Sequence, residues 1–184
     1  MKQTGMVRKI DELGRVVIPK EIRNVLRLNV GMQLEIYINE NSELVLKKFH
    51  PVTSLAEIAQ GFCDVLNQML NKSILVCNKE KIIAYTGENK KSFINKEINE
   101  KLVDLVCSSS NYVANNSDGT TIIDITTEKL NNCKSQLFLP ILAGENCEGL
   151  IGLLGFADDE ISTHDIKSLE LVSKYINRQL TNEN

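Results

Sequence analysis

Cationic side chains are concentrated near the amino terminus, in the segment RKIDELGRVVIPKEIRNVLRL that spans residues 8–28. The six cations of this segment are Arg8, Lys9, Arg15, Lys20, Arg23 and Arg27. Guanidinium groups carried on strands or on a helix suit phosphate oxygens and the acceptor edge of guanine in the major groove of DNA. The chemistry that these residue types offer is therefore the binding of a polyanion rather than a covalent reaction.

The charge of the chain is unevenly divided. Across 184 residues the formal charge is −3. Residues 1–50 contain nine Lys and Arg against six Asp and Glu, which gives +3, and the remainder therefore carries −6. Such asymmetry indicates that one part of the chain meets a polyanion. The alternative is a solvated face on which these cations pair with neighbouring acids, but in residues 1–27 seven cations exceed three acids.

The sequence contains no pattern typical of an enzyme or a metal site. His50 and His164 are far apart, so no zinc site can be drawn from them. His164 precedes Asp165, but no motif places a Ser or Cys nucleophile beside the pair. The glycines of GLIGLLG (149–155) match no phosphate-binding loop and are typical of a packed strand. We therefore expect no catalytic residues, no metal and no cofactor.

The five cysteines predict an intracellular setting. Their number is odd, they lie in apolar or mixed stretches, and they form no C-x-x-C pair. We expect all five to be reduced and mostly buried thiols, as in a cytosolic protein. The start MKQTGMVRKI has no apolar signal core, and no apolar run approaches the roughly 18 residues that span a bilayer. The cysteines are Cys63, Cys77, Cys107, Cys133 and Cys147.

The first fifty residues must position the cations on short elements. Alternating apolar residues and turn residues predict four strands and one helix. A fold this small buries too little apolar surface to be stable alone, so we expect an intertwined dimer. The expected elements are strands at 4–10 and 15–18 around a turn at 11–14, a helix from Pro19 to Leu28, and a hairpin over 34–49 with its turn at 39–42.

The expected elements bring the cations into two groups. Arg8 and Arg15 flank the turn at 11–14. Lys20, Arg23 and Arg27 follow the spacing i, i+3, i+7, which places them on one face of a continuous helix. A two-fold dimer would lay two such sets side by side.

A second domain follows a boundary at HPVTSL, residues 50–55. Its pattern predicts one antiparallel α/β sandwich, in which terminal helices flank five strands. Ser162 or Thr163, together with Asp165, is expected to cap the last helix. We expect domains at 1–51 and 52–184. The predicted helices are 54–70, 95–109 and 162–180, and the predicted strands are 73–78, 81–87, 120–126, 135–142 and 147–156.

The stretches TGMVRKIDELGRVVIPKEIRNVLRL and GMQLEIYINENSELVLKKF resemble the AbrB family of bacterial transition-state regulators over nearly all of residues 4–49. The resemblance implies a swapped-hairpin β-barrel dimer whose arginines contact double-stranded DNA. Where close relatives carry a second arginine after Arg23, this chain has Asn24, which could hydrogen-bond adenine instead. A rim or salt-bridge role is implied for Lys20 and Arg27. The DNA-contacting positions implied by the resemblance are Arg8, Lys9, Arg15, Arg23 and Asn24.

The second domain and its junction KKFHPVTSLAEIAQGF resemble sporulation regulators in which this hairpin is joined to a GAF-type domain. Element order and the phrases SILVCN, FLPIL and GLIGLLGF carry that resemblance. It implies an α+β protein that regulates transcription of sporulation genes, forms a homotetramer through helices of the GAF-like domain, and acts in the cytoplasm on the nucleoid. The alternative is an antitoxin with the same hairpin, but a folded domain here replaces the disordered tail that binds a toxin.

GAF domains often hold a small molecule, and seven residues are candidates for lining such a cavity. The same residues would equally be needed to pack the sandwich. The N-K-F-D-E signature of cyclic-nucleotide GAF domains is absent, so neither cAMP nor cGMP is expected, and the identity of any ligand stays open. The candidates are Cys77, Tyr85, Phe93, Leu137, Leu139, Ile141 and Leu153.

Overall fold

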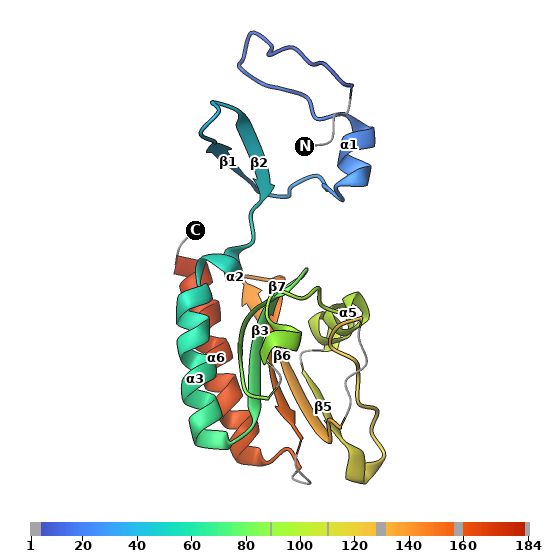
Figure 1. The fold of residues 1–184 in the computed structure, drawn as a ribbon, viewed down its shortest axis with the longest axis vertical. Coiled ribbons are helices and arrows are strands. Elements are labelled where there is room, and N and C mark those ends of the chain that lie inside the picture. The colour runs from blue at the N-terminus through green and yellow to red at the C-terminus, as the bar shows by residue number, and fades with distance from the viewer. Residues whose placement is uncertain (1–4, 89, 110, 128–131, 157–159, 183–184) are drawn as a thin grey trace. The chain divides into compact units, whose positions relative to one another are not determined.

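The computed structural model describes residues 5–88, 90–109, 111–127, 132–156 and 160–182. The chain divides into two compact units, residues 1–49 and 50–184 (Figure 1). Helices and antiparallel sheets occur together in the chain, so the expected α+β fold class is confirmed.

Over its described residues, 5–49, the first unit contains one helix and one hairpin. The expected hairpin is confirmed: β1 (Leu34–Ile38) pairs with β2 (Leu44–Lys48) in an antiparallel ladder. Its turn is closed by the Asn39 side chain, because the Asn39 Oδ1 atom accepts a hydrogen bond of 2.9 Å from the Glu43 backbone N–H. Ser42, in the same turn, has a left-handed backbone with φ of 59°.

A second turn of the same kind spans Asp11 to Arg15. The Asp11 Oδ1 atom accepts backbone N–H groups from Leu13 at 3.0 Å and from Arg15 at 2.8 Å. The Asp11 N–H donates in turn to the Arg15 carbonyl at 3.0 Å. Gly14 takes the left-handed conformation, with φ of 74°, that this turn requires. The predicted turn at 11–14 is therefore present.

The strands predicted at 4–10 and 15–18 are wrong for a single copy of the chain. Over the described residues, the segments on either side of the turn run as long stretches of backbone (Figure 1) and belong to no helix or sheet. A strand needs a neighbour to accept its backbone hydrogen bonds. The two segments do not provide that neighbour for each other, although the turn between them is of the hairpin kind.

The helix of the first unit is shorter than predicted. α1 covers Lys20–Val25. Two residues beyond its end, Arg27 has a left-handed backbone with φ of 52°. The Leu28 N–H donates to the Arg23 carbonyl at 2.7 Å and closes the helix end. The expectation that Arg27 shares a helical face with Lys20 and Arg23 is therefore wrong, because the helix ends before Arg27.

The second unit is built on a five-stranded antiparallel sheet with the strand order β4-β3-β7-β6-β5. Strands β6 and β7 are the longest and lie next to each other in this order. The strands are β3 (Ser73–Asn78), β4 (Ile82–Thr86), β5 (Tyr112–Asn115), β6 (Ser135–Ala143) and β7 (Asn146–Gly155).

Helices cover both faces of this sheet and create two separate cores. The long helices α3 (Ala56–Leu70) and α6 (Thr163–Asn182) lie side by side over one face, and α5 (Glu100–Ser109) lies over the other (Figure 1). The first core therefore lies between the sheet and the two long helices, and the second lies under α5. Shorter helical segments are α2 (Pro51–Ser54), α4 (Lys90–Phe93) and η1 (Asn116–Asp118).

The edge strand of the sheet differs from the prediction. Residues 112–115 form β5, whereas the segment predicted as a strand at 120–126 is not one. The buried side chain of Gln136, rather than a neighbouring strand, makes hydrogen bonds to the backbone of this segment. Its Nε2 donates to the Ile123 carbonyl at 2.8 Å, and its Oε1 accepts the Ile123 N–H at 2.9 Å. The apolar pattern of the segment instead reflects burial of residues such as Ile125.

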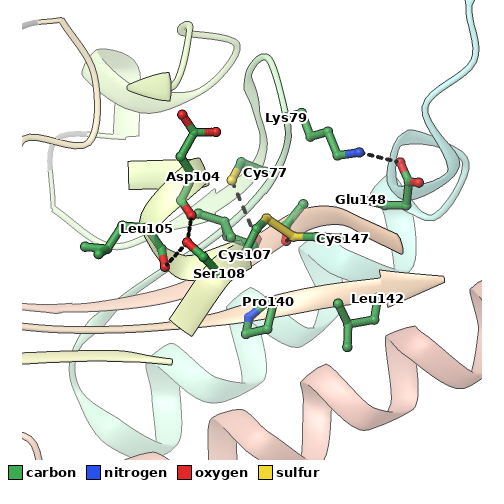
Figure 2. Close-up of a disulfide and its surroundings, with 12 residues drawn as sticks. Cys77, Lys79, Asp104, Leu105, Cys107, Ser108, Pro140, Leu142, Cys147 and Glu148 are labelled. Atoms are coloured by element: carbon green, nitrogen blue, oxygen red, sulfur yellow. Dashed lines mark hydrogen bonds and ion pairs between the residues drawn. A yellow bond between two sulfur atoms is a disulfide. The ribbon is translucent and has the colours of Figure 1, made fainter. Parts of the chain in front are cut away.

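The expectation that all five cysteines are reduced is wrong for two of them. Cys107 in α5 and Cys147 in β7 form a disulfide (Figure 2). Cys63, Cys77 and Cys133 are free and buried, as expected. Burial raises the pKa of the Cys63 and Cys77 thiols to about 12 and that of Cys133 to about 11, so these three are unreactive near neutral pH.

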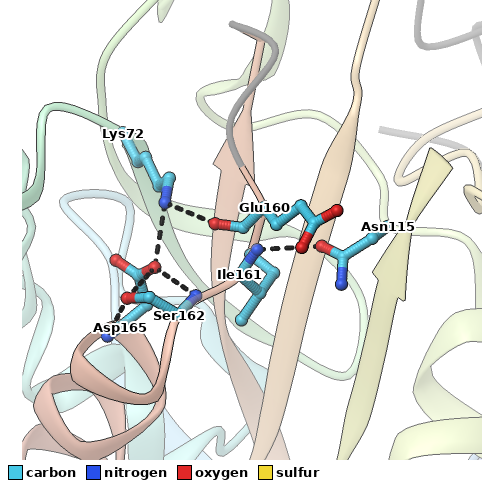
Figure 3. Close-up of polar contacts among 6 residues, drawn as sticks. All are labelled: Lys72, Asn115, Glu160, Ile161, Ser162 and Asp165. Atoms are coloured by element: carbon cyan, nitrogen blue, oxygen red, sulfur yellow. Dashed lines mark hydrogen bonds and ion pairs between the residues drawn. The ribbon is translucent and has the colours of Figure 1, made fainter. Parts of the chain in front are cut away.

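A buried ion pair joins the start of β3 to the start of α6. The Lys72 Nζ atom lies 2.9 Å from the Asp165 Oδ2 atom, and both side chains are almost fully buried (Figure 3). The same carboxylate accepts the Ser162 N–H and hydroxyl, both at 2.7 Å, which confirms the predicted cap. Burial alone would raise the pKa of Asp165, but the donors from Lys72 and Ser162 outweigh it and lower that pKa.

We predict that Lys72→Met destabilises the protein by about 3 kcal/mol, because it leaves the Asp165 carboxylate buried without its cation. Urea unfolding at pH 7 measures this free energy. The matched control is Lys79→Met, which breaks a more exposed pair with Glu148 and should cost less than about 1 kcal/mol. Lys72→Met combined with Asp165→Asn should recover part of the loss. Equal costs for the two Lys variants would contradict this account.

The stability difference between the native protein and Asp165→Asn should depend on pH. The folded-state pKa of Asp165 lies below the ordinary 3.8, so its charge stabilises the fold above that value. This contribution is lost as the pH falls through the folded-state pKa. Urea unfolding between pH 7 and 3 should therefore show a difference that is constant down to about pH 4 and shrinks below it. A difference that stays constant to pH 3 would show that the carboxylate charge does not matter.

Candidate nucleic-acid interface

Three of the five predicted DNA-binding residues lie around the turn at Asp11–Arg15. Arg8, Lys9 and Arg15 are all exposed. The Arg8 Nη1 atom donates to the neighbouring Val7 carbonyl at 3.0 Å, which is a local contact that fixes no distant element. The turn therefore carries two arginines and a lysine that solvent, or a ligand, can reach.

Arg15 is held by the residue that builds the turn. Its Nε atom donates to the Asp11 Oδ2 atom at 2.8 Å in an exposed ion pair. Hydrogen bonds from the Arg15 backbone and then from its side chain lower the pKa of Asp11. An exposed pair of this kind contributes little to stability. Because the backbone N–H groups hold the other oxygen of Asp11, the guanidinium can exchange the carboxylate for a phosphate while the turn persists.

The other two predicted residues, Arg23 and Asn24, lie on α1. Arg23 is half-buried, and its Nε atom is shielded from solvent without a hydrogen-bond partner. The Asn24 side chain is exposed, and the Asn24 backbone carbonyl accepts the Arg27 N–H at 3.2 Å. The structure thus divides the predicted residues between the turn and the helix.

Sequence reasoning missed the role of Asp11. The sequence predicts a turn at 11–14 that includes Asp11, but not that the Asp11 carboxylate organises the backbone between the two arginines of the turn. The signal was present, because Asp followed three residues later by Gly is typical of a turn in which the carboxylate accepts backbone N–H groups.

The first unit leaves its apolar side chains exposed. Among residues 5–49 no residue is buried in a single copy of the chain. On the hairpin, Ile36 opposes Leu46 and Ile38 opposes Leu44, so the four form one apolar face. An exposed apolar face of this kind is typical of a surface that packs against another chain. Large apolar residues more than half exposed are Val7, Ile10, Leu13, Val16, Val17, Val25, Leu26, Val30, Ile36, Ile38 and Leu44.

The candidate ligand cavity of the second unit is not supported by the structure. Its seven proposed lining residues lie in the two different cores, on opposite faces of the sheet. Cys77, Tyr85 and Phe93 are in the core under α5, where the two rings stack at 4.8 Å. Leu137, Leu139, Ile141 and Leu153 are in the core under α3 and α6. Strand alternation separates them, because successive side chains point to opposite faces.

Two further kinds of site are not found in the part of the chain that the structure describes. No group of three or more His, Cys, Asp or Glu side chains is arranged there to hold a metal ion. Likewise, none of its described helices has the length and apolar character needed to cross a membrane.

Comparison with known proteins assigns the second unit. Residues 54–181 match the family described as stage V sporulation protein T C-terminal, transcription factor. The chain belongs to the stage V sporulation protein T family. Stage V sporulation protein T of Bacillus subtilis (strain 168) is 34% identical over 180 residues, which cover 98% of this chain and 99% of the relative. The similarity therefore extends across both units.

The two units have further relatives of their own. Residues 7–51 match the family described as antidote-toxin recognition MazE, bacterial antitoxin. A 51-residue segment is 53% identical to transition state regulatory protein AbrB of Bacillus subtilis (strain 168), covering 28% of this chain and 52% of that protein. The GAF domain of an Acinetobacter phosphoenolpyruvate-protein phosphotransferase superposes with a TM-score of 0.57 at 13% identity, over 70% of this chain and 82% of that one. This chain thus combines an AbrB-type unit with a unit of GAF-like fold.

Proposed function

We propose that this protein is a sequence-specific regulator of sporulation genes that binds double-stranded DNA through its first unit. Membership of a transcription-factor family and full-length similarity to stage V sporulation protein T support the proposal. The observation that carries it is the exposed turn with Arg8, Lys9 and Arg15, within a segment 53% identical to AbrB. The protein would accordingly act inside the cell, on the nucleoid.

The first unit is proposed to work as an intertwined homodimer. Its turn at Asp11–Arg15 is of the hairpin kind, but the segments on either side are not paired with each other. A second copy would supply the missing strand neighbours and cover the exposed apolar side chains. It would also bring the cations of two such turns together. The resulting surface has two-fold symmetry and matches two half-sites on a duplex.

Each predicted residue has a role in this DNA surface. Arg15, released from Asp11, and Arg8 would contact phosphates or guanine edges, and Lys9 would add charge nearby. Arg23 is half-buried, and the part of its side chain that solvent reaches would contact DNA from α1. Asn24 offers an amide, which can pair with adenine in two hydrogen bonds.

The GAF-like unit is proposed to join two such dimers into a homotetramer. Its two long helices expose apolar side chains beside the edge-to-face contact between Phe62 and Tyr175. A matching face on another copy would bury these side chains in a helical bundle. We assign this unit to assembly rather than ligand sensing, because the candidate lining residues lie in separate cores. The exposed residues are Ile58, Val65 and Met69 of α3 and Leu171 and Tyr175 of α6.

A toxin-binding role is the second candidate, since residues 7–51 match a family described as a bacterial antitoxin. The full-length relative favours the regulator, because its similarity extends across the GAF-like unit as well. Co-purification with a small ribonuclease from the native host, in place of DNA, would support the antitoxin role.

We predict that Arg8→Ala and Arg15→Ala each weaken DNA binding and flatten its dependence on salt. Each substitution removes two cations from a dimer, so the slope of log K against log salt should fall by about two if both contact phosphates. The measurement is fluorescence anisotropy from 50 to 300 mM salt, on a duplex selected from a random pool by the native protein.

The control for these variants is Arg178→Ala, which removes an exposed arginine from α6 in the second unit. It should leave both affinity and salt slope unchanged. If Arg8→Ala and Arg15→Ala bound the duplex as the native protein does across the titration, the assignment of the turn to DNA would be wrong.

Light scattering should separate the two proposed interfaces. The native chain is expected to have the mass of four chains. Ile36→Asp, on the apolar face of the hairpin, and Leu171→Asp, on α6, should each halve that mass, because each opens a different interface. Together they should give a single chain. Lys47→Asp, on the opposite face of the hairpin, is the control and should stay tetrameric. A single-chain mass for the native protein would refute the assembly.

A further inference from the structure

Two cysteines far apart in the sequence meet at the border of the core under α5. Cys107 lies in the last turn of α5, and Cys147 is the second residue of β7. Their Cα atoms are 5.7 Å apart, within the usual range for a disulfide, and their sulfur atoms are bonded (Figure 2). They are separated by 40 residues, so the fold rather than the local sequence brings them together.

These two cysteines differ from the other three in their access to solvent. Cys63, Cys77 and Cys133 are buried, and burial raises the pKa of each thiol. Cys107 and Cys147 are instead only partly buried, at the periphery of the core. A small oxidant or a small thiol can therefore reach them, while the other three are protected.

The bond fastens α5, which is shorter than the two helices on the other face of the sheet. α5 has 10 residues, and its fully or nearly buried side chains are Leu102, Val103 and Val106. The helices on the other face, α3 and α6, have 15 and 20 residues. A covalent tie from Cys107 to the sheet therefore constrains α5 more than it would constrain either long helix.

We propose that Cys107 and Cys147 are a redox-modification site, a reversible disulfide that fastens α5 to β7 under oxidising conditions. The intracellular setting rests on the proposed function, and low-molecular-weight thiols inside a cell keep such pairs reduced. With hydrogen peroxide as the oxidant, one thiol loses its proton and the thiolate attacks an oxygen. The O–O bond breaks, a sulfenic acid forms, and the released hydroxide takes up the proton to give one water. The second thiol displaces the hydroxyl of that sulfenic acid as a second water, which closes the S–S bond.

The reverse reaction requires a thiol reductant such as glutathione. Two glutathione molecules reduce the bond by successive exchange, and they leave as oxidised glutathione while both protein thiols are restored. The cycle uses no DNA and no residue of the first unit. Its success or failure is therefore independent of the proposed DNA binding.

Closing the bond should stabilise the second unit, because it removes conformations from the unfolded chain between residues 107 and 147. The test incubates the full chain in glutathione buffers of stepped reduced-to-oxidised ratio. Alkylation and mass spectrometry then identify the linked peptides, and calorimetry gives the melting temperature. We expect one transition from two free thiols to a Cys107–Cys147 link, with a rise in melting temperature of about 10 °C. Brief hydrogen peroxide treatment of the reduced chain should produce the same link.

The variants Cys107→Ser and Cys147→Ser should melt at one temperature in every buffer, near that of the reduced native chain. Cys133→Ala is the matched control and should keep the full response. The native-chain measurement stands alone if a variant does not fold. The proposal is overturned if peroxide leaves five free thiols, if the link forms between two chains, if it resists excess reduced glutathione, or if the melting temperature is the same in both states.

Discussion

A single copy of residues 5–49 has no interior, and the assembly proposed for this protein depends on this constraint. Each apolar side chain of that unit is at least partly exposed, while the second unit has two cores of its own. The hydrophobic effect therefore favours covering this surface, which the proposed pairing of first units would do. Because the cations lie on the same short segments, any association that covers the apolar surface also gathers positive charge. Stability and DNA recognition in the proposed regulator would thus arise from one event.

The fold could be predicted from the sequence wherever a pattern reports on contacts within the chain. The hairpin around Asn39 and the cap at Ser162 were identified correctly, because turn and cap residues act on their immediate neighbours. The strand expected at 120–126 failed because a distant side chain, Gln136, supplies its hydrogen bonds. Similarly, the disulfide between Cys107 and Cys147 depends on the packing of α5 against β7, and no spacing rule encodes that.

In the candidate site too, features set by neighbouring residues could be predicted from the sequence, and other features could not. Charge and turn residues were enough to predict Arg8 and Arg15 on either side of one turn. The assignment of Arg27 to a helical face failed because a non-glycine residue took the left-handed conformation, which local propensity disfavours. The seven candidate cavity residues have apolar character in common. Apolar character does not reveal which face of a strand a residue occupies when both faces are covered.

The two Asx-closed turns have a consequence for how the molecule assembles. Asp11 and Asn39 close loops of five residues with their own side chains, so both loops can form in an isolated chain within microseconds. Joining the segments on either side of the Asp11 turn to a second copy requires diffusion, and its rate rises with protein concentration. Newly made chains would therefore have their arginines positioned around a closed loop before they meet a second copy. The concentration of the protein inside the cell would then set how fast the DNA-binding dimer forms.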